Sequence, residues 1–349
     1  AFTASLAASG IGLIVVALAS LVTLFTKAGK KGAEFSKAIS GLGAITGKTS
    51  EELEVLSDQA KELGSTTAFT ASQVVSLQTE LAKLGFTIQD IENATPAILD
   101  LSASLDVSLA EAATFAGSVV RSFGLTTQDT LNVVNVLADS TTKSALNFSL
   151  LSESLKLVAP TAKAVGLSLA DTTALLGVLA DNGIKGSRAG TGLSRALTDL
   201  NAKGLTLNDA YKKINSSSNK LVTATDLVGT VGGRALLTLA SNTGAINDLA
   251  DALTNVDDAA ARLIAEKRLD NLAGDTTKLA SAWEGFLLNI EDGTGVLNKL
   301  SRGAIKLLTN SIGAFQDAVS ITTFYLRDMF LDLKQRGSNA VVFAIGYFQ

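Results

Sequence analysis

One signal returns along most of the chain: a Ser or Thr, two further residues, an acidic residue or Gln, and then an apolar helical stripe. This is the pattern of a capping box, in which the hydroxyl accepts a hydrogen bond from an unpaired N–H at the start of a helix. Such repetition predicts a succession of helices with short breaks between them. The residues that carry the signal are the predicted helix caps: Thr49, Thr70, Thr87, Ser108, Thr126, Ser168 and Thr206.

Four of these helix starts share a longer form, in which a Gly and an apolar residue precede the Ser or Thr, and an Asp follows it. The form reads GFTIQD from residue 85, GLTTQD from 124, GLSLAD from 166 and GLTLND from 204. The Gly would end one helix and the hydroxyl would begin the next. A spacing of about 40 residues is typical of stacked helical repeats.

The residues between these signals favour helices over strands. Apolar side chains follow the three-and-four spacing of one buried helix face, as in Leu53, Leu56, Ala60 and Leu63. The chain is poor in the aromatic residues that strands favour, at 5%. We predict an all-α protein, either a multi-helix bundle or an irregular stacked array of units of about 40 residues, with apolar helices at the ends. Pro96 is expected to start a helix and Pro160 to mark a kink or a boundary.

The patterns divide the chain into four predicted segments. Residues 1–32 form an apolar helix, residues 33–215 a helical core domain, and residues 216–300 a second helical subdomain that begins in the run NSSSN. Residues 301–349 are expected to form a long amphipathic helix that leads into an apolar segment. Because the chain starts with Ala and stops within an apolar run, we expect it to be part of a longer protein.

The first 26 residues carry no charge and are long enough, at about 1.5 Å per residue, to cross a membrane as one helix. A buried helix rich in small residues is the alternative, because Ser and Thr dilute the apolar character. The candidate membrane-inserting side chains are Ile11, Leu13, Ile14, Val15, Val16, Leu18, Leu21, Val22, Leu24 and Phe25.

The absence of His and Cys from the sequence excludes zinc sites built from those residues, nucleophile–His dyads and disulfides. The net charge of −4 gives no general basic face for nucleic acid, so we expect no specific nucleic-acid binding. No cofactor or metal site is predicted. A lone Glu153 in an amphipathic helix offers only a weak candidate for a muramidase acid.

The densest cluster of glycine and basic residues is NGIKGSRAGTGLSRAL, residues 182–197. Its backbone could form a nest of N–H groups for phosphate, with Lys185 and Arg188 beside it. Because no strand precedes it, a tight turn between two helices is the better interpretation. The preceding helix is expected to end at Asn182 and Gly183, and the next to open at Thr191 or Gly192.

The stretch LGVLADNGIKGSRAGTGLSRAL resembles the most characteristic segment of the tail tape measure proteins of long-tailed phages. Several other stretches, among them LQTELAKLGFTIQDI and VLADSTTKSALNFSLLSESLKLVAP, agree with the likeness in the same order, over roughly residues 33–210. LASAWEGFLLNIEDGTG resembles the segment that closes this region. The family-motif turn falls on Gly183, Ile184, Lys185, Gly186, Ser187, Ala189, Gly190 and Thr191.

The resemblance implies a structural virion protein that lies in the lumen of the tail tube, sets tail length and assists DNA delivery through the host envelope. It also implies assembly in the host cytoplasm with tail tube protein, tail assembly chaperones and tail tip proteins, as a homo-oligomer, with contact to the host inner membrane. No enzymatic activity is expected. The alternatives are a membrane-active, pore-forming helical protein and, less well supported, a muramidase.

Overall fold

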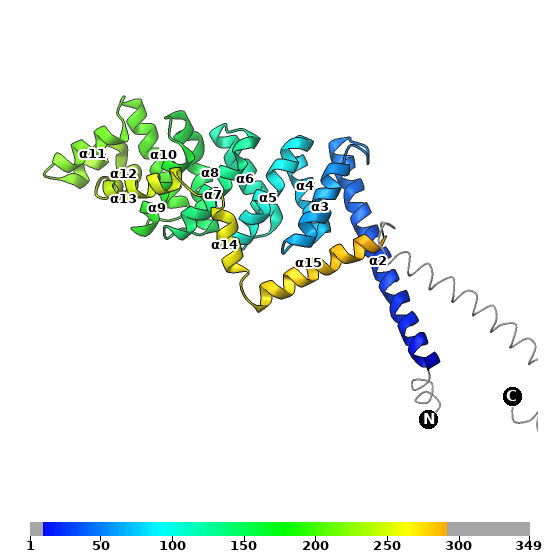
Figure 1. The fold of residues 1–349 in the computed structure, drawn as a ribbon. Coiled ribbons are helices and arrows are strands. Elements are labelled where there is room, and N and C mark those ends of the chain that lie inside the picture. The colour runs from blue at the N-terminus through cyan, green and yellow to red at the C-terminus, as the bar shows by residue number, and fades with distance from the viewer. Residues whose placement is uncertain (1–9, 292–349) are drawn as a thin grey trace, which may run out of the picture. The chain divides into compact units, whose positions relative to one another are not determined.

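The computed structural model describes residues 10–291, and the side chains of residues 27–288 (Figure 1). The described residues form fourteen α-helices and one short 3-10 turn, and none of them lies in a strand. The predicted all-α class with stacked helices is therefore confirmed. The helices are α2 (Gly10–Thr46), α3 (Glu54–Thr66), α4 (Ala71–Lys83), α5 (Ile88–Leu105), α6 (Leu109–Phe123), α7 (Thr130–Thr142), α8 (Phe148–Ala164), α9 (Leu169–Asp181), α10 (Ser187–Ala202), α11 (Leu207–Ser216), α12 (Lys220–Ala240), α13 (Thr243–Thr254), α14 (Ala260–Arg268) and α15 (Leu272–Glu291).

One compact unit runs from Lys31 to Phe286, so it contains residues on both sides of the predicted boundary at 215. The other unit comprises residues 1–30 and 287–349, of which the structure describes the first part of α2 and the last residues of α15. The predicted amphipathic helix of residues 301–349 lies outside the described residues.

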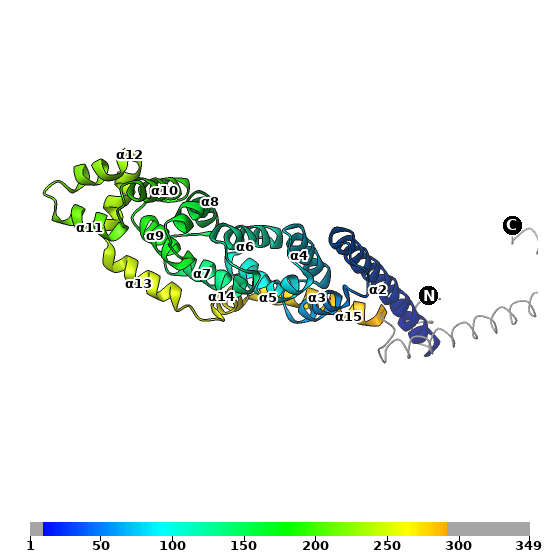
Figure 2. The same cartoon turned by 90° about the horizontal axis from the view of Figure 1, so that it is seen from above.

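Helices of the unit Lys31–Phe286 stack in two layers (Figures 1 and 2). The first layer holds α3, α5, α7 and α9, and the second holds α4, α6, α8, α10 and α12, with each helix packed on the next one of its own layer. One helix from each layer makes up a repeat. The glycine-marked repeats predicted from the sequence thus correspond to consecutive helix pairs of the stack.

Hydroxyl caps and glycines set the helix boundaries of this array. Thr70 accepts a hydrogen bond from the N–H of Gln73 at 3.3 Å, while the Gln73 side chain accepts one from the Thr70 N–H at 2.8 Å. At the other end of a repeat, Gly124 and Gly166 adopt φ angles of 66° and 81° after α6 and α8. Glycine enters this left-handed region without steric cost, so it stops a helix at a fixed residue.

Both prolines lie inside helices. Pro96 is in the middle of α5, which corrects the expectation that it starts a helix. Pro160 lies inside α8, so of its two predicted roles, a kink or a boundary, the boundary is wrong. A proline leaves the carbonyl four residues earlier without its helical partner. In α5 that carbonyl belongs to Glu92, and the side chain of Gln59 donates to it at 2.7 Å from α3. A tertiary bond thus satisfies the group that the sequence pattern leaves open.

After α12 the chain turns back along the first layer (Figure 2). Helix α13 packs on α9 and α7, and α14 packs on α7 and α5. Within the same unit, α15 reaches the end of α3, where Gly285 lies against Ser65. Residues 243–286 therefore form a strap that crosses the repeats in the direction opposite to their order in the sequence.

The apolar start of the chain falls partly within α2, which is one continuous helix from Gly10 to Thr46. Residues 1–9 lie outside the described part. Among the described residues, no helix meets the length and hydropathy needed for a membrane span.

Candidate functional site: the glycine-rich turn between α9 and α10

The turn after α9 is closed by its own backbone. Gly183, at φ 81°, donates its N–H to the carbonyl of Ala180 at 3.0 Å, and Ile184 donates to Leu179 at 2.8 Å. This pair of bonds is a Schellman motif, which ends a helix by using its last carbonyls. Because the N–H groups of Gly183 and Ile184 are used within the turn, they do not form the nest for an anion that the sequence suggested.

Helix α10 begins at Ser187, with Gly186 as its N-cap at φ 57°, so it starts four residues before the predicted Thr191. The Ser154 hydroxyl of α8 donates to the Gly186 carbonyl at 2.8 Å in a buried position. Gly190 and Gly192 therefore lie inside the helix, although glycine is a poor helix former. Tertiary packing overrides local propensity here.

The two glycines within α10 allow close contact with the helices on either side. A Cβ atom on Gly190 would lie 2.5 Å from the Ser154 carbonyl oxygen of α8, and one on Gly192 would lie 3.1 Å from the Ala235 Cβ of α12. Further along, the Thr161 and Ser194 hydroxyls are 2.9 Å apart. The family-motif turn thus joins three helices, α8, α10 and α12, through small side chains.

A groove of about 700 Å³ lies beside this junction. Its described lining contains two arginines, Arg188 and Arg234, and no carboxylate. Both arginines are exposed, whereas Lys185 is half-buried. Exposed basic residues beside a turn closed by its own backbone agree with the interpretation as a tight turn between two helices.

Glu153, the muramidase candidate, is exposed on α8 beside the turn. Its carboxylate approaches Gly186 so closely that a Cβ there would lie 2.7 Å from Glu153 Oε2. Most glycosidases use a pair of carboxyl groups that flank the bond to be cleaved. The lining of the adjacent groove offers none to act with Glu153.

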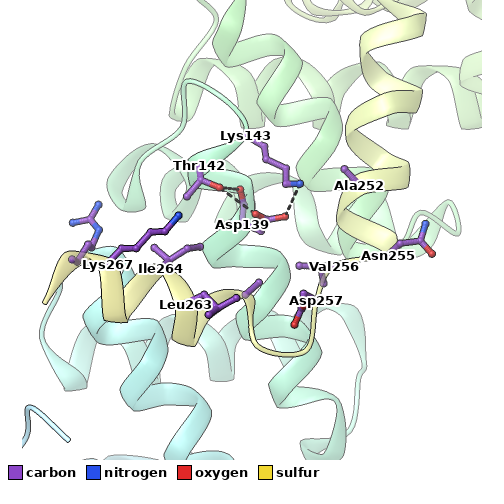
Figure 3. A pocket seen from close by; sticks show the side chains of 12 residues that line it. Asp139, Thr142, Lys143, Ala252, Asn255, Val256, Asp257, Leu263, Ile264 and Lys267 are labelled. Carbon is purple, nitrogen blue, oxygen red and sulfur yellow. Dashed lines mark hydrogen bonds and ion pairs between the residues drawn. The ribbon is translucent and has the colours of Figure 1, made fainter. Parts of the chain in front are cut away.

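A second pocket, of about 620 Å³, lies where the strap meets the array, between α7, α13 and α14 (Figure 3). On one wall Lys143 pairs with Asp139 at 3.4 Å, and on the other lie Leu263 and Ile264 of α14. Within the described part of the chain, no group of three or more acidic, His or Cys side chains could hold a metal ion.

The predicted caps occupy the starts of helices or of the turns that lead into them. Thr70, Thr87, Ser108, Ser168 and Thr206 each accept a hydrogen bond from the backbone three residues later, at the starts of α4, α5, α6, α9 and α11. Thr126 precedes the 3-10 turn Thr127–Asp129, and α7 follows it. Thr49 bonds with Glu52 in a turn, while α3 begins only at Glu54.

Sequence reasoning missed a buried asparagine on α7, Asn135, which is 1% exposed and binds the backbone before and within α14. Its one signal is a polar residue in an apolar run, NVVNVLA, where a fully buried helix face is expected. The spacing Gly-x-Gly in SRAGTGL was visible, and it could have indicated close helix packing rather than a helix start.

Comparison with known proteins identifies the array. Residues 57–276 match the family model described as phage-related minor tail protein. The chain belongs to this phage minor tail protein family. The match covers most of α3, all of α4 to α14 and the first residues of α15, so it contains the whole glycine-rich turn and most of the strap.

Two relatives of the chain carry the name tape measure protein. A tape measure protein of Pneumococcus phage Dp-1 is 32% identical over 309 residues, which is 81% of the present chain and 27% of the relative. A probable tape measure protein of Escherichia phage P2 is 29% identical over 354 residues, or 92% of the chain and 43% of the relative. The chain therefore spans less than half of either relative. No solved structure matches it.

Proposed function

We propose that this chain is the folded helical section of a tape measure protein and that its repeats contribute to the length of the tail. The observation that carries the proposal is the continuous match to the minor tail protein family over a regular array of helix pairs. The resemblance to tape measure proteins drawn from the sequence is confirmed by the two phage relatives. The role is structural rather than enzymatic.

The repeats suit such a role because each one adds the same kind of unit. A repeat of about 40 residues adds little to the length of the stack when folded, but about 60 Å if its residues form one extended helix, at 1.5 Å per residue. Glycines at the joints, such as Gly124 and Gly166, let helix pairs separate without breaking a helix.

As a component of the virion, the chain would lie in the lumen of the tail tube, after assembly in the host cytoplasm. There it would contact the tail tube protein, tail assembly chaperones and tail tip proteins, and further copies of itself. A part in DNA delivery, with contact to the host inner membrane through residues 1–26, completes the proposal. Failure of a peptide of residues 1–26 to bind liposomes would remove its membrane part.

Deletion of one repeat tests the ruler role. Residues 124–165 run from the C-cap of α6 to the C-cap of α8 and so remove one joint and one helix pair. In a phage that carries this deletion in the whole tape measure gene, electron microscopy should show tails shorter by about 60 Å. Tails of normal length would place the ruler elsewhere in the parent protein.

The matched control replaces residues 124–165 with a copy of residues 166–203, the next repeat. It restores a helix pair of nearly the same length and should restore nearly the full tail. If the deletion and the replacement shorten the tail equally, the effect comes from disturbed assembly rather than from residue number, and the ruler proposal is wrong for this section.

A further inference from the structure

A stack of repeats has contacts only between neighbours, so its ends are coupled weakly and it can bend or open one joint at a time. In this chain the strap of residues 243–286 adds contacts of a different kind. Its helices α13 and α14 lie across the joints of the first layer, from α9 through α7 to α5. The strap therefore couples repeats that are not adjacent in the chain.

Asn135 of α7 fastens the middle of the strap. Its side-chain amide donates to the carbonyl of Asp258 at 2.9 Å, and its carbonyl oxygen accepts from the N–H of Ala261 at 2.9 Å. Asp258 lies in the turn before α14 and Ala261 in its first turn, both more than 120 residues away from Asn135 in sequence. One buried side chain thus uses its donor and its acceptor to hold the backbone of the strap.

Glu284 of α15 makes a second fastening near the far end of the strap. One carboxylate oxygen accepts from the N–H of Ser72, in the first turn of α4, at 3.1 Å, and the other lies 3.4 Å from the Lys31 ammonium. The side chain of Glu284 is 6% exposed. A carboxylate at the start of a helix is stabilised by the unpaired N–H groups there.

Between these fastenings the strap buries little apolar surface. The buried residues of α14 are three alanines, whereas α6 in the array buries Phe115, Val119, Val120 and Phe123 among others. Leu263 of α14 is 46% exposed and borders the pocket between strap and array (Figure 3). Elements with few buried apolar contacts open at a lower free energy than the rest of a protein.

We propose that residues 256–286 of the strap are a releasable segment that locks the array in its stacked form, with Asn135 as the principal fastening. This segment detaches before the repeats separate, while α13, which buries Ile246, Leu249 and Leu253 and packs on α9, stays in place. In a tail, the array would lengthen only after this segment is released. This consequence rests on the proposed function, whereas the release itself does not.

Amide hydrogen exchange on the full chain tests the release. We expect the amides of residues 256–268 to exchange faster than those of α8 and α10 under native conditions. Asn135→Ala should raise exchange in residues 256–268 about tenfold, the factor that corresponds to about 1.4 kcal/mol for two lost hydrogen bonds. Exchange in α8 and α10 should stay within about twofold of the unmodified chain.

Asn215→Ala is the matched control, because Asn215 makes a comparable bond to the Ala240 carbonyl, at 2.9 Å, away from the strap. It should leave exchange in residues 256–268 unchanged. If residues 256–268 exchange together with α8 and α10 in both the unmodified chain and Asn135→Ala, the strap is part of one cooperative unit and the proposal fails.

A disulfide gives a second test that does not depend on removing a bond. The chain has no Cys, and a Cβ on Gly285 would lie 3.1 Å from the Ser65 Cβ, a few tenths of an ångström short of ordinary disulfide geometry. In the double variant Ser65→Cys, Gly285→Cys, oxidation should slow exchange in residues 272–286 and reduction should restore it. Equal exchange in the oxidised and reduced forms would contradict a releasable segment. Neither test involves a phage tail. Failure of the releasable segment can therefore be told apart from failure of the proposed ruler role.

Discussion

Gly190 of α10 passes so close to Ser154 of α8 that a single added methyl group would lie 2.5 Å from the Ser154 carbonyl oxygen. A neighbouring bond, from the Ser154 hydroxyl to the Gly186 carbonyl, holds the same two helices together at the start of α10. The glycine-rich turn therefore acts through helix packing, and its stability depends on the absence of side chains at particular positions.

Gly190→Ala should destabilise the array by about 1–3 kcal/mol, because backbone atoms of α8 cannot move away as a flexible side chain could. Urea unfolding followed by circular dichroism measures the change. Gly41→Ala is the control, since a Cβ at Gly41 of α2 meets no atom within 4 Å. That variant should be neutral or slightly stabilising, because alanine favours helix. Equal stability of the two variants would contradict the packing role.

Asp90 links two consecutive repeats and should make stability fall in acid. Hydrogen bonds from Thr127 and then Thr87 lower the pKa of this carboxyl below its ordinary value. Its contribution to stability is complete above the unfolded pKa, near 3.9, and is lost as the pH falls through the lower folded value.

Asp90→Asn should flatten the acid limb of a plot of unfolding free energy against pH below about pH 4. Asp58→Asn controls for loss of one carboxylate, because the Asp58 side chain is 69% exposed and its contact with Lys61 is 4.0 Å long. The role of Asp90 is disproved if both variants follow the same acid limb.

Asp100 of α5 should make the stability of the chain fall as the pH rises, whereas Asp90 makes it fall in acid. Burial raises the pKa of the Asp100 carboxyl to about 6. The positive charge of Arg262 on α14 lowers this pKa, and the negative charge of Glu266 raises it further. Between about pH 4 and 6 the folded chain binds the extra proton, so this group makes stability decrease as the pH rises through that window. Asp100→Asn should remove this slope and stabilise the chain at pH 7, by about 1 kcal/mol after allowance for partial exposure. An unchanged slope in unfolding measured from pH 4 to 7 would show that the carboxyl is not buried as described.

Patterns local in sequence predicted much of this fold. The hydroxyl caps and the glycines at 85, 124, 166 and 204 carry their signal within six residues, because capping satisfies the helix's own backbone. The helix period then identified the buried faces. These local signals are sufficient to predict a stack in which each repeat contacts its neighbours.

The features that the sequence did not predict depend on partners far along the chain. Pro96 is tolerated inside α5 because the Gln59 side chain binds the backbone carbonyl that the proline leaves without a partner. Gly190 lies inside α10 because α8 packs so closely there that a side chain would not fit. The strap is held by Asn135, whose partners lie in α14 and the turn before it. A single sequence carries no record of such pairs, so these positions suggest a break or a loop when taken alone.

The kink in α12 depends on one glycine backbone. Gly229 adopts φ 68° and ψ 177°, a conformation that is essentially restricted to glycine, and a Cβ there would meet no atom within 4 Å. Just before it, the ammonium group of Lys203 donates to the carbonyls of Asp226 and Leu227 at 2.8 and 2.5 Å. The first part of α12 therefore ends at a fixed point.

Gly229→Ala should cost about 1–3 kcal/mol through backbone strain alone, since nothing blocks the methyl group. Gly244→Ala in α13 is the matched control, because its Cβ also meets no atom within 4 Å and its backbone is helical. The control should be stabilised by about 0.5–1 kcal/mol. Thermal and urea unfolding of the two variants measure the difference. If both variants shift stability in the same direction, the kink at Gly229 is not the strained, glycine-dependent joint that the backbone angles indicate.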